Sequence, residues 1–235
     1  MKTILQIVMP FWLMRSYEIY YRVWKASVIG VFMLVRQIKK WGDNFTYLIA
    51  DEVTLEGAVI DPGFNAEAVI KAAREEGVKV KYVIVTHHHF DHTMGIGLVK
   101  RAFRAAVAAF NDSKVDKDVV LADGDLLKIG GTEIKVMHTP GHTKDGICLL
   151  VGGAVFTGDT LFVGECGRTD FREGDSKEMY RSLFGKLMAL DDATIVYPGH
   201  DYGQKAYSTI GEERANNYTL KKRTIEEFVR FMKEP

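Results

Sequence analysis

Short apolar runs alternate with helical patterns along the chain from Val31 onward, and Gly, Asp and Pro mark the turns between them. Residues 45–51 and 57–63 predict two strands around a turn, and the continuous apolar run over 81–86 predicts a buried strand. Residues 66–77 predict a helix that ends near Gly77, with apolar residues on one face at Ala68, Val69, Ala72 and Ala73.

The rest of the chain follows the same plan of β-rich units that are each closed by a helix. The pattern predicts a helix over 94–103, a strand over 105–110, two strands around a Gly-Gly turn over 121–139, a hairpin over 146–159, a helix over 176–190, a buried strand over 193–200 and a helical tail from Tyr202. This order indicates an α+β fold in which two sheets pack face to face with helices outside.

Composition narrows the class of protein. The chain has 235 residues, of which 47% are apolar, so one substantial domain is expected. Its 31 basic and 31 acidic residues balance, and no run of like charge stands out, so we expect no nucleic acid as partner. A small-molecule substrate fits better, and a homo-oligomer is compatible with this composition. The two cysteines, Cys148 and Cys166, make no disulfide or redox motif, which favours the cytoplasm.

The N-terminal segment is treated separately. It begins like a signal peptide, but Pro10 interrupts its apolar stretch, and no run approaches the roughly 18 residues that span a bilayer, which argues against a membrane. Residues 33–52 already provide a strand, a turn and a second strand, a complete opening for the fold. Our hypothesis is that Met33 is the natural start, that residues 1–32 are an extension outside the native fold, and that 33–235 form the catalytic domain.

A histidine-rich segment directly follows the buried strand at 81–86. If it is extended, His87, His89 and Asp91 share one face, while His88 and Phe90 point away. Further candidate ligands come at the ends of later predicted strands, and they are His142, Asp159 and His200. Zinc and related metals take imidazole and carboxylate ligands, so this pattern predicts a metal site at one edge of the sheets.

The alternative is that each histidine has only a structural role, which is the better explanation for a lone histidine. Here five of the seven histidines, with His92 as the fifth, fall in the pattern, each after a strand and beside a glycine or a second ligand, so we prefer the metal site. His88 and His138 are left over. We expect His88 to face away from the ligands and His138 to belong to a strand that leads into the Pro-Gly turn.

The segments HHHFDH, TPGHT, TGDTLF and YPGHDY, in that order, resemble the motif series of the metallo-β-lactamase superfamily over Met33 to the C-terminus. The resemblance implies a four-layer αββα sandwich with the site at one end of the sheets. It also implies two divalent metal ions. The first would be held by His87, His89 and His142, the second by Asp91, His92 and His200, and Asp159 would bridge them.

Those roles imply a hydrolase. A metal can lower the pKa of bound water from 15.7 to about 7, and the resulting metal-bound hydroxide is the expected nucleophile. Asp91 is the candidate catalytic residue, since its carboxylate could orient that nucleophile. A thiolate leaves without much protonation because thiol pKa values lie near 8.5, so a small thioester of a thiol conjugate is the expected substrate.

Two branches of the superfamily stay open. The sequence is similar to glyoxalase II, a thioester hydrolase, and the loop Cys166-Gly167-Arg168-Thr169-Asp170-Phe171 also resembles persulfide dioxygenase. In that alternative, one iron would sit on His87, His142 and Asp159. We favour the hydrolase with zinc, with iron or manganese as alternatives, because the full two-metal set is present. A non-catalytic metal-binding or sensor protein is the third possibility.

Two residues near the site have two explanations each. Arg168 is a candidate for substrate binding, since a guanidinium can hold a carboxylate, and the alternative is a structural ion pair with Asp170. Cys166 is expected to serve packing and not to act as a nucleophile.

Overall fold

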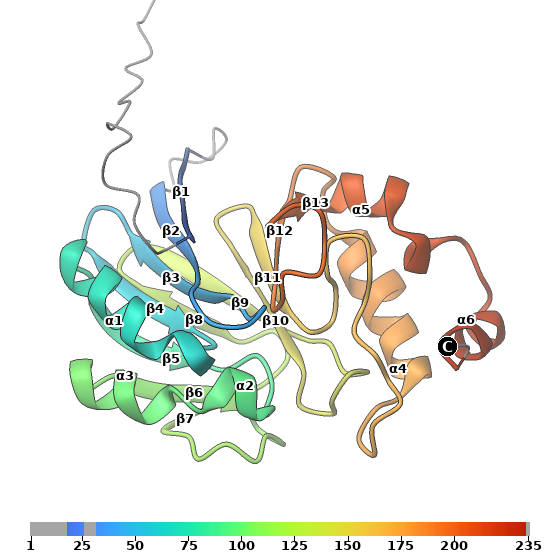
Figure 1. Ribbon diagram of the computed structural model, residues 1–235, viewed down its shortest axis with the longest axis horizontal. Helices are drawn as coiled ribbons and strands as arrows, with labels where there is room; N and C mark the ends of the chain where they lie inside the picture. Colours follow the sequence, from blue (N-terminus) through green and yellow to red (C-terminus); the bar gives the residue numbers. More distant parts are fainter. Residues whose placement is uncertain (1–17, 26–31, 234–235) are drawn as a thin grey trace, which may run out of the picture.

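Two β-sheets lie face to face, and helices cover the outer face of each (Figure 1). The computed structural model describes residues 18–25 and 32–233. The layers confirm the predicted α+β sandwich of αββα type. Within the described part of the chain, no helix is long and apolar enough to cross a membrane.

The first sheet has the strand order β1-β2-β3-β4-β5-β6-β7. Its strands are β1 (Glu18–Lys25), β2 (Phe32–Lys39), β3 (Thr46–Asp51), β4 (Glu56–Ile60), β5 (Lys79–Ile84), β6 (Ala106–Phe110) and β7 (Val119–Leu121). Pairing is antiparallel from β1 to β4 and parallel from β4 to β7. The carboxyl ends of β4 and β5 therefore meet at the same edge of the sheet.

The second sheet has the order β13-β12-β11-β10-β9-β8. It contains β8 (Leu126–Ile129), β9 (Thr132–His138), β10 (Ile147–Val151), β11 (Ala154–Gly158), β12 (Ile195–Pro198) and β13 (Ser208–Thr209). Only β11 and β12 run parallel, with the chain returning through the helices between them. Their carboxyl ends again share one edge.

The helices form the two outer layers. Helices α1 (Ala66–Glu75) and α3 (Ile96–Phe103) lie on the first sheet, and α4 (Ser176–Tyr180), α5 (Ile210–Asn216) and α6 (Ile225–Phe231) lie beside the second (Figure 1). A short helix, α2 (Phe90–Thr93), stands at the edge where the strands end. Short turns of helix cover Gly63–Asn65, Leu187–Ala189 and Tyr218–Leu220.

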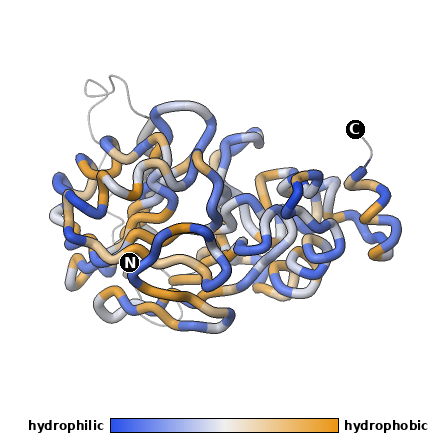
Figure 2. The backbone as a smooth tube through the Cα atoms, turned by 90° about the horizontal axis from the view of Figure 1, so that it is seen from below, coloured by the Kyte–Doolittle hydropathy of each residue, from blue (hydrophilic) through white to orange (hydrophobic). Residues whose placement is uncertain are grey.

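Three apolar clusters hold the four layers together, and hydrophobic stretches alternate with hydrophilic ones along the trace in Figure 2. The first lies between the sheets around Phe45, Tyr47 and Phe156. The second joins α1 and α3 to the first sheet, and the third joins the second sheet to the C-terminal helices around Phe228. The predicted apolar face of α1 is buried, as expected from its spacing.

Some elements differ from expectation. The predicted helix over 176–190 is interrupted, since a π-helical segment, Arg181–Lys186, and a 3₁₀ turn follow α4. The tail from Tyr202 contains β13 before its helices. Strand β1 lies within the predicted N-terminal extension and pairs with β2, whereas residues 1–17 and 26–31 lie outside the described residues.

The intersheet core predicts a stability effect at Phe156, which is 1% exposed and packs between Tyr47 and Tyr197. Replacing it with alanine leaves a cavity, so Phe156→Ala should lower the free energy of unfolding by about 3–5 kcal/mol in urea denaturation. Val53→Ala is the control, since Val53 is 84% exposed and should change stability by less than about 0.5 kcal/mol. Equal effects of the two variants would contradict this account of the core.

Candidate metal centre

The seven predicted ligands come from loops at the carboxyl ends of four strands. His87 and His89 follow β5, and Asp91 and His92 lie on α2 just beyond them. The other three follow β9, β11 and β12 and are His142, Asp159 and His200. The structure brings all seven side chains together at one end of the sandwich, in two adjoining groups.

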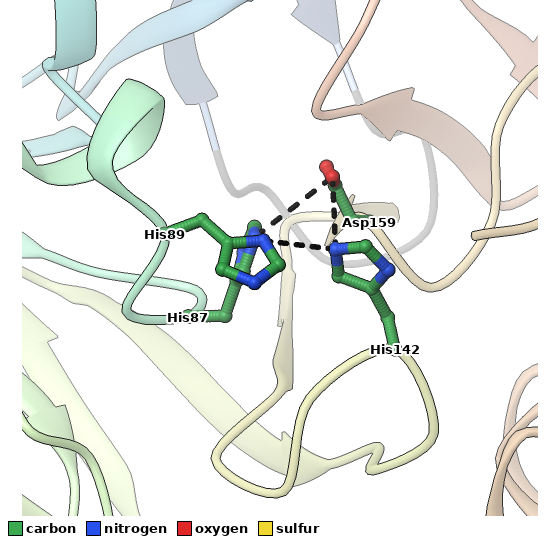
Figure 3. Close-up of side chains that lie close together, drawn as sticks. All are labelled: His87, His89, His142 and Asp159. Carbon is green, nitrogen blue, oxygen red and sulfur yellow. Dashed lines mark hydrogen bonds and ion pairs between the residues drawn. The ribbon is translucent and has the colours of Figure 1, made fainter. Parts of the chain in front are cut away.

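The first group contains His87, His89, His142 and Asp159 (Figure 3). Nδ1 of His89 lies 3.1 Å from Nε2 of His87 and 3.0 Å from Nε2 of His142. The Oδ2 atom of Asp159 lies 3.4 Å from Nε2 of His142 and 3.8 Å from Nε2 of His87. Three imidazole nitrogens and a carboxylate oxygen therefore face one small volume.

The second group contains Asp91, His92 and His200. The Nε2 atoms of His92 and His200 are 3.1 Å apart, and Oδ2 of Asp91 lies 3.4 Å from Nε2 of His200. Asp159 lies between the groups, since its Oδ1 is 3.4 Å from His92 and its Oδ2 is 3.3 Å from His200. The two groups coincide with the two ligand sets that the resemblance implied, and their role as metal ligands is our proposal.

One expectation about this segment is wrong. The segment is not a continuous extended stretch, because the chain bends at Thr86 and His87 and α2 begins at Phe90, so the alternation of a strand does not place Asp91. On the helix, neighbouring side chains diverge by about a quarter turn, so Asp91 and His92 can both reach the second group. The helical turn thus supplies two side chains to the second group, while His87 and His89 before it belong to the first.

The second ring nitrogen of four histidines is held by a neighbour, which leaves Nε2 directed into the site. Nδ1 of His142 donates to the backbone oxygen of Arg168 at 2.8 Å. Nδ1 of His87 lies 3.2 Å from Oγ1 of Thr86. Nδ1 of His92 lies 3.0 Å from Oδ2 of Asp61, and Nδ1 of His200 lies 3.2 Å from Oδ1 of Asp43. These contacts fix the ring orientations before any ligand binds.

Asp61 is the most connected of these supporting residues, and sequence reasoning missed it. Its side chain is buried, accepts hydrogen bonds from the Thr86 backbone N–H at 2.8 Å and the Thr86 hydroxyl at 2.6 Å, and also contacts His92. Its φ of 47° is a left-handed conformation that non-glycine residues rarely adopt. The Asp-Pro-Gly sequence that ends β4 is the signal that could have identified it.

Asp43 and Asn44, in the loop before β3, were missed as well. Asn44 is buried and donates from Nδ2 to Oδ2 of Asp91 at 2.9 Å, so it fixes the carboxylate of a predicted ligand. Its backbone also bridges to His200. No motif spacing marked these residues, since their neighbours in space are distant in sequence.

Burial and the neighbouring charges set the protonation of the site. Burial lowers the pKa of His87 well below its usual value, and His92 lowers it further. Burial also lowers the pKa of His92, but the carboxylates of Asp159 and Asp61 outweigh this and raise it to about 9. Burial would raise the pKa of Asp159, yet His92 and His87 hold it well below its ordinary range.

These residues fit divalent metal ions. Ring nitrogens about 3 Å apart cannot all donate to one another, and neutral imidazole and carboxylate are ligands of zinc, iron and manganese. Oδ1 of Asp159 is buried and has no hydrogen-bond partner among the described residues, so a cation would satisfy it. The groups present can hold metal in either set.

A pocket of about 360 Å³ opens onto the groups, and His89, Asp91 and Arg168 are part of its lining. Arg168 makes two bonds to Asp170, at 2.6 and 2.5 Å, and its guanidinium lies 4.6 Å from the ring centre of Phe171. The ion pair that we considered as the alternative is therefore present, although both side chains are exposed. A substrate role for Arg168 stays a proposal, because exposed pairs exchange partners at small cost.

The remaining candidates lie as expected. His88 turns away from the ligands and contacts Asp145 at 2.8 Å, and His138 ends β9 and stacks on Phe110. Cys166 is buried, and burial raises the pKa of its thiol to about 12, so it stays protonated and inert at neutral pH.

An αββα sandwich with two groups of histidine and aspartate side chains at one end is typical of a class of metal-dependent enzymes. The model of the metallo-beta-lactamase superfamily matches residues 40–117 and 108–200. The chain belongs to this superfamily.

Enzymes of two kinds are among its relatives. The chain is 42% identical over 69% of its length to the Arabidopsis thaliana cytoplasmic hydroxyacylglutathione hydrolase, of which it spans 66%, just under two thirds. It is 33% identical over 86% of its length to the Homo sapiens mitochondrial persulfide dioxygenase ETHE1, of which it spans 82%. The crystal structure of ETHE1 from Myxococcus xanthus superimposes with a TM-score of 0.81 at 35% identity, over 86% of this chain and 90% of that one.

The supporting contacts predict which variants lose metal. Asp61→Asn removes the charge that orients His92 and should lower metal affinity about 10- to 100-fold, measured by competition with a chromophoric chelator. Asp43→Asn is the matched control, because Asp43 contacts His200 from a side chain that is 52% exposed, and its loss should be smaller. If Asp43→Asn lost more metal affinity than Asp61→Asn, the buried contact of Asp61 would not be the stronger support.

Proposed function

We propose that the enzyme hydrolyses a small thioester of a thiol conjugate, in the manner of a hydroxyacylglutathione hydrolase. The observation that carries the proposal is the complete second group of Asp91, His92 and His200, beside a complete first group. Two divalent metal ions, when bound, supply a water of lowered pKa and polarise the carbonyl under attack. In a site with one metal these three residues would need a role other than metal binding.

The residues of the chain would divide the remaining work. Asp91 lines the pocket, and Asn44 holds its Oδ2, so its carboxylate is placed to orient the attacking water and accept a proton. Phe162 and Phe171 line the same pocket and limit the access of bulk water. The thiolate that leaves needs no dedicated acid, because thiol pKa values lie near 8.5.

Persulfide dioxygenase is the second candidate, and a specific observation favours it. The crystal structure of ETHE1 from Myxococcus xanthus superimposes with a TM-score of 0.81 over 86% of this chain and 90% of that one. Under that alternative, a single iron would be held by His87, His142 and Asp159, a two-histidine-one-carboxylate set that leaves positions free. The second group would then be a remnant, which is why we prefer the hydrolase.

Metal content and two assays on one fresh preparation separate the candidates. We expect about two metal ions per chain, turnover of S-D-lactoylglutathione, and loss of that turnover after chelation with recovery on adding zinc. About one iron per chain, with oxygen uptake on glutathione persulfide and no thioester turnover, would replace the hydrolase with the dioxygenase.

Arg168 is proposed to hold a carboxylate of the thiol conjugate. Arg168→Lys should raise the KM for the thioester about tenfold with kcat little changed, because lysine lacks the two-pronged geometry of a guanidinium. Circular dichroism would check that the fold is intact. Asp170→Asn weakens the ion pair but keeps the Arg168 guanidinium, so the KM of this variant for the thioester should stay equal or fall. If Asp170→Asn matched the defect of Arg168→Lys, the ion pair itself would be the function of Arg168.

A further inference from the structure

A second hollow adjoins the metal pocket, and we call it the side chamber. It has a volume of about 470 Å³, and Tyr202 and Glu165 line both it and the metal pocket. The ring of Tyr202 is stacked on His200, with ring centroids 4.8 Å apart, so the wall between the two hollows rests on a predicted ligand. A molecule bound at the metal centre can therefore extend past Tyr202 into the side chamber.

A buried carboxylate forms part of the wall of the side chamber. Glu213 on α5 is 3% exposed, and its Oε2 accepts hydrogen bonds from the Gly164 backbone at 2.8 Å and from Nδ2 of Asn217 at 2.7 Å. Both donors are neutral, and no ion pair found among the described residues includes Glu213. A carboxylate away from water is costly without an opposite charge, so a cation in the chamber would be stabilised.

The rest of the lining adds to this preference. Glu165 and Glu212 are exposed at the wall, and of these Glu212 is paired with Lys205 at 3.2 Å, so three glutamates face one lysine. Ser208 lines the chamber, is 2% exposed, and its hydroxyl has no hydrogen-bond partner among the described residues. A hydrogen-bonding cation would thus meet both negative charge and an unsatisfied polar group.

We propose that the side chamber binds a primary ammonium group at the end of the thiol conjugate remote from the reacting acyl group. A primary ammonium carries one positive charge and three donors, which suits carboxylates and a hydroxyl. The inference rests on the proposed thiol-conjugate substrate and adds a specificity site to it. The glutamates of the chamber select the ligand by charge, while the metal centre acts on its other end.

Calorimetry with two unreactive probes tests the proposal. S-methylglutathione carries a free ammonium group, and its N-acetyl derivative lacks that charge but keeps the rest of the molecule. We expect the wild-type metal-loaded enzyme to bind the free amine about tenfold more tightly, a factor that corresponds to about 1.4 kcal/mol. In Glu165→Gln and in Glu213→Gln, this preference should fall below about threefold.

Glu133→Gln is the matched control, because it removes one carboxylate from β9 that pairs with Lys128 on the surface, and it should keep the full preference. Equal binding of the two probes, no binding of either, or a preference unchanged in both chamber variants would overturn the proposal. If Glu213→Gln fails to fold, the exposed Glu165→Gln decides.

Thioester turnover in the same preparations tests the proposed function separately. Turnover without a preference for the ammonium group would reject the side chamber and leave the hydrolase. A preference lost in the chamber variants, without turnover, would keep the chamber as a ligand site and reject the hydrolase.

Discussion

The rest of the site depends on the contacts between the carboxylate of Asp159 and the histidines around it. This carboxylate lies between histidines that would repel one another if protonated, and its charge offsets them from the centre. The backbone around it leaves no spare room. A Cβ on Gly199 would come 2.3 Å from Oδ1 of Asp159, and one on Gly167 would come 1.8 Å from its backbone oxygen. Side chains at either position would displace the carboxylate or the loop that carries it.

The two sheets can meet this constraint because each ligand loop is tied to its neighbour by backbone hydrogen bonds. Gly199 donates to Gly158 at 2.8 Å, Phe45 donates to Gly199 at 2.8 Å, and Ile147 donates to Thr86 at 2.9 Å, which joins loops from both sheets. The apolar core beneath, around Phe45, Tyr47 and Phe156, holds the strands in register. Precise placement of the ligands is thus a consequence of packing that begins well below the site.

Sequence patterns predicted much of this because strand ends and ligand loops leave local signals. Apolar runs followed by glycine and histidine placed His142, Asp159 and His200 at the correct strand ends, and helical spacing placed α1. The predicted direction of the Asp91 side chain was wrong, because it assumed the alternation of an extended segment and the chain becomes helical at Phe90. Asn44 and Glu213 could not be predicted, because their roles depend on partners that only the tertiary fold brings near. Asp61 left a local signal in the Asp-Pro-Gly sequence after β4, but its contact with His92 also depends on the tertiary fold.

The arrangement around the second group also bears on the choice between the two proposed activities. Burying His92 and His200, with Asp91 half-buried beside them, costs free energy unless their polar atoms find partners. The chain provides such partners from outside the group, since Asp61 holds His92, Asp43 contacts His200 and Asn44 holds Asp91. One of these supports comes from a residue in a left-handed conformation, Asp61, so it is held at a cost in backbone strain. The same contacts would orient Asp91, His92 and His200 as ligands of a second metal, which is the arrangement that the proposed two-metal hydrolase needs.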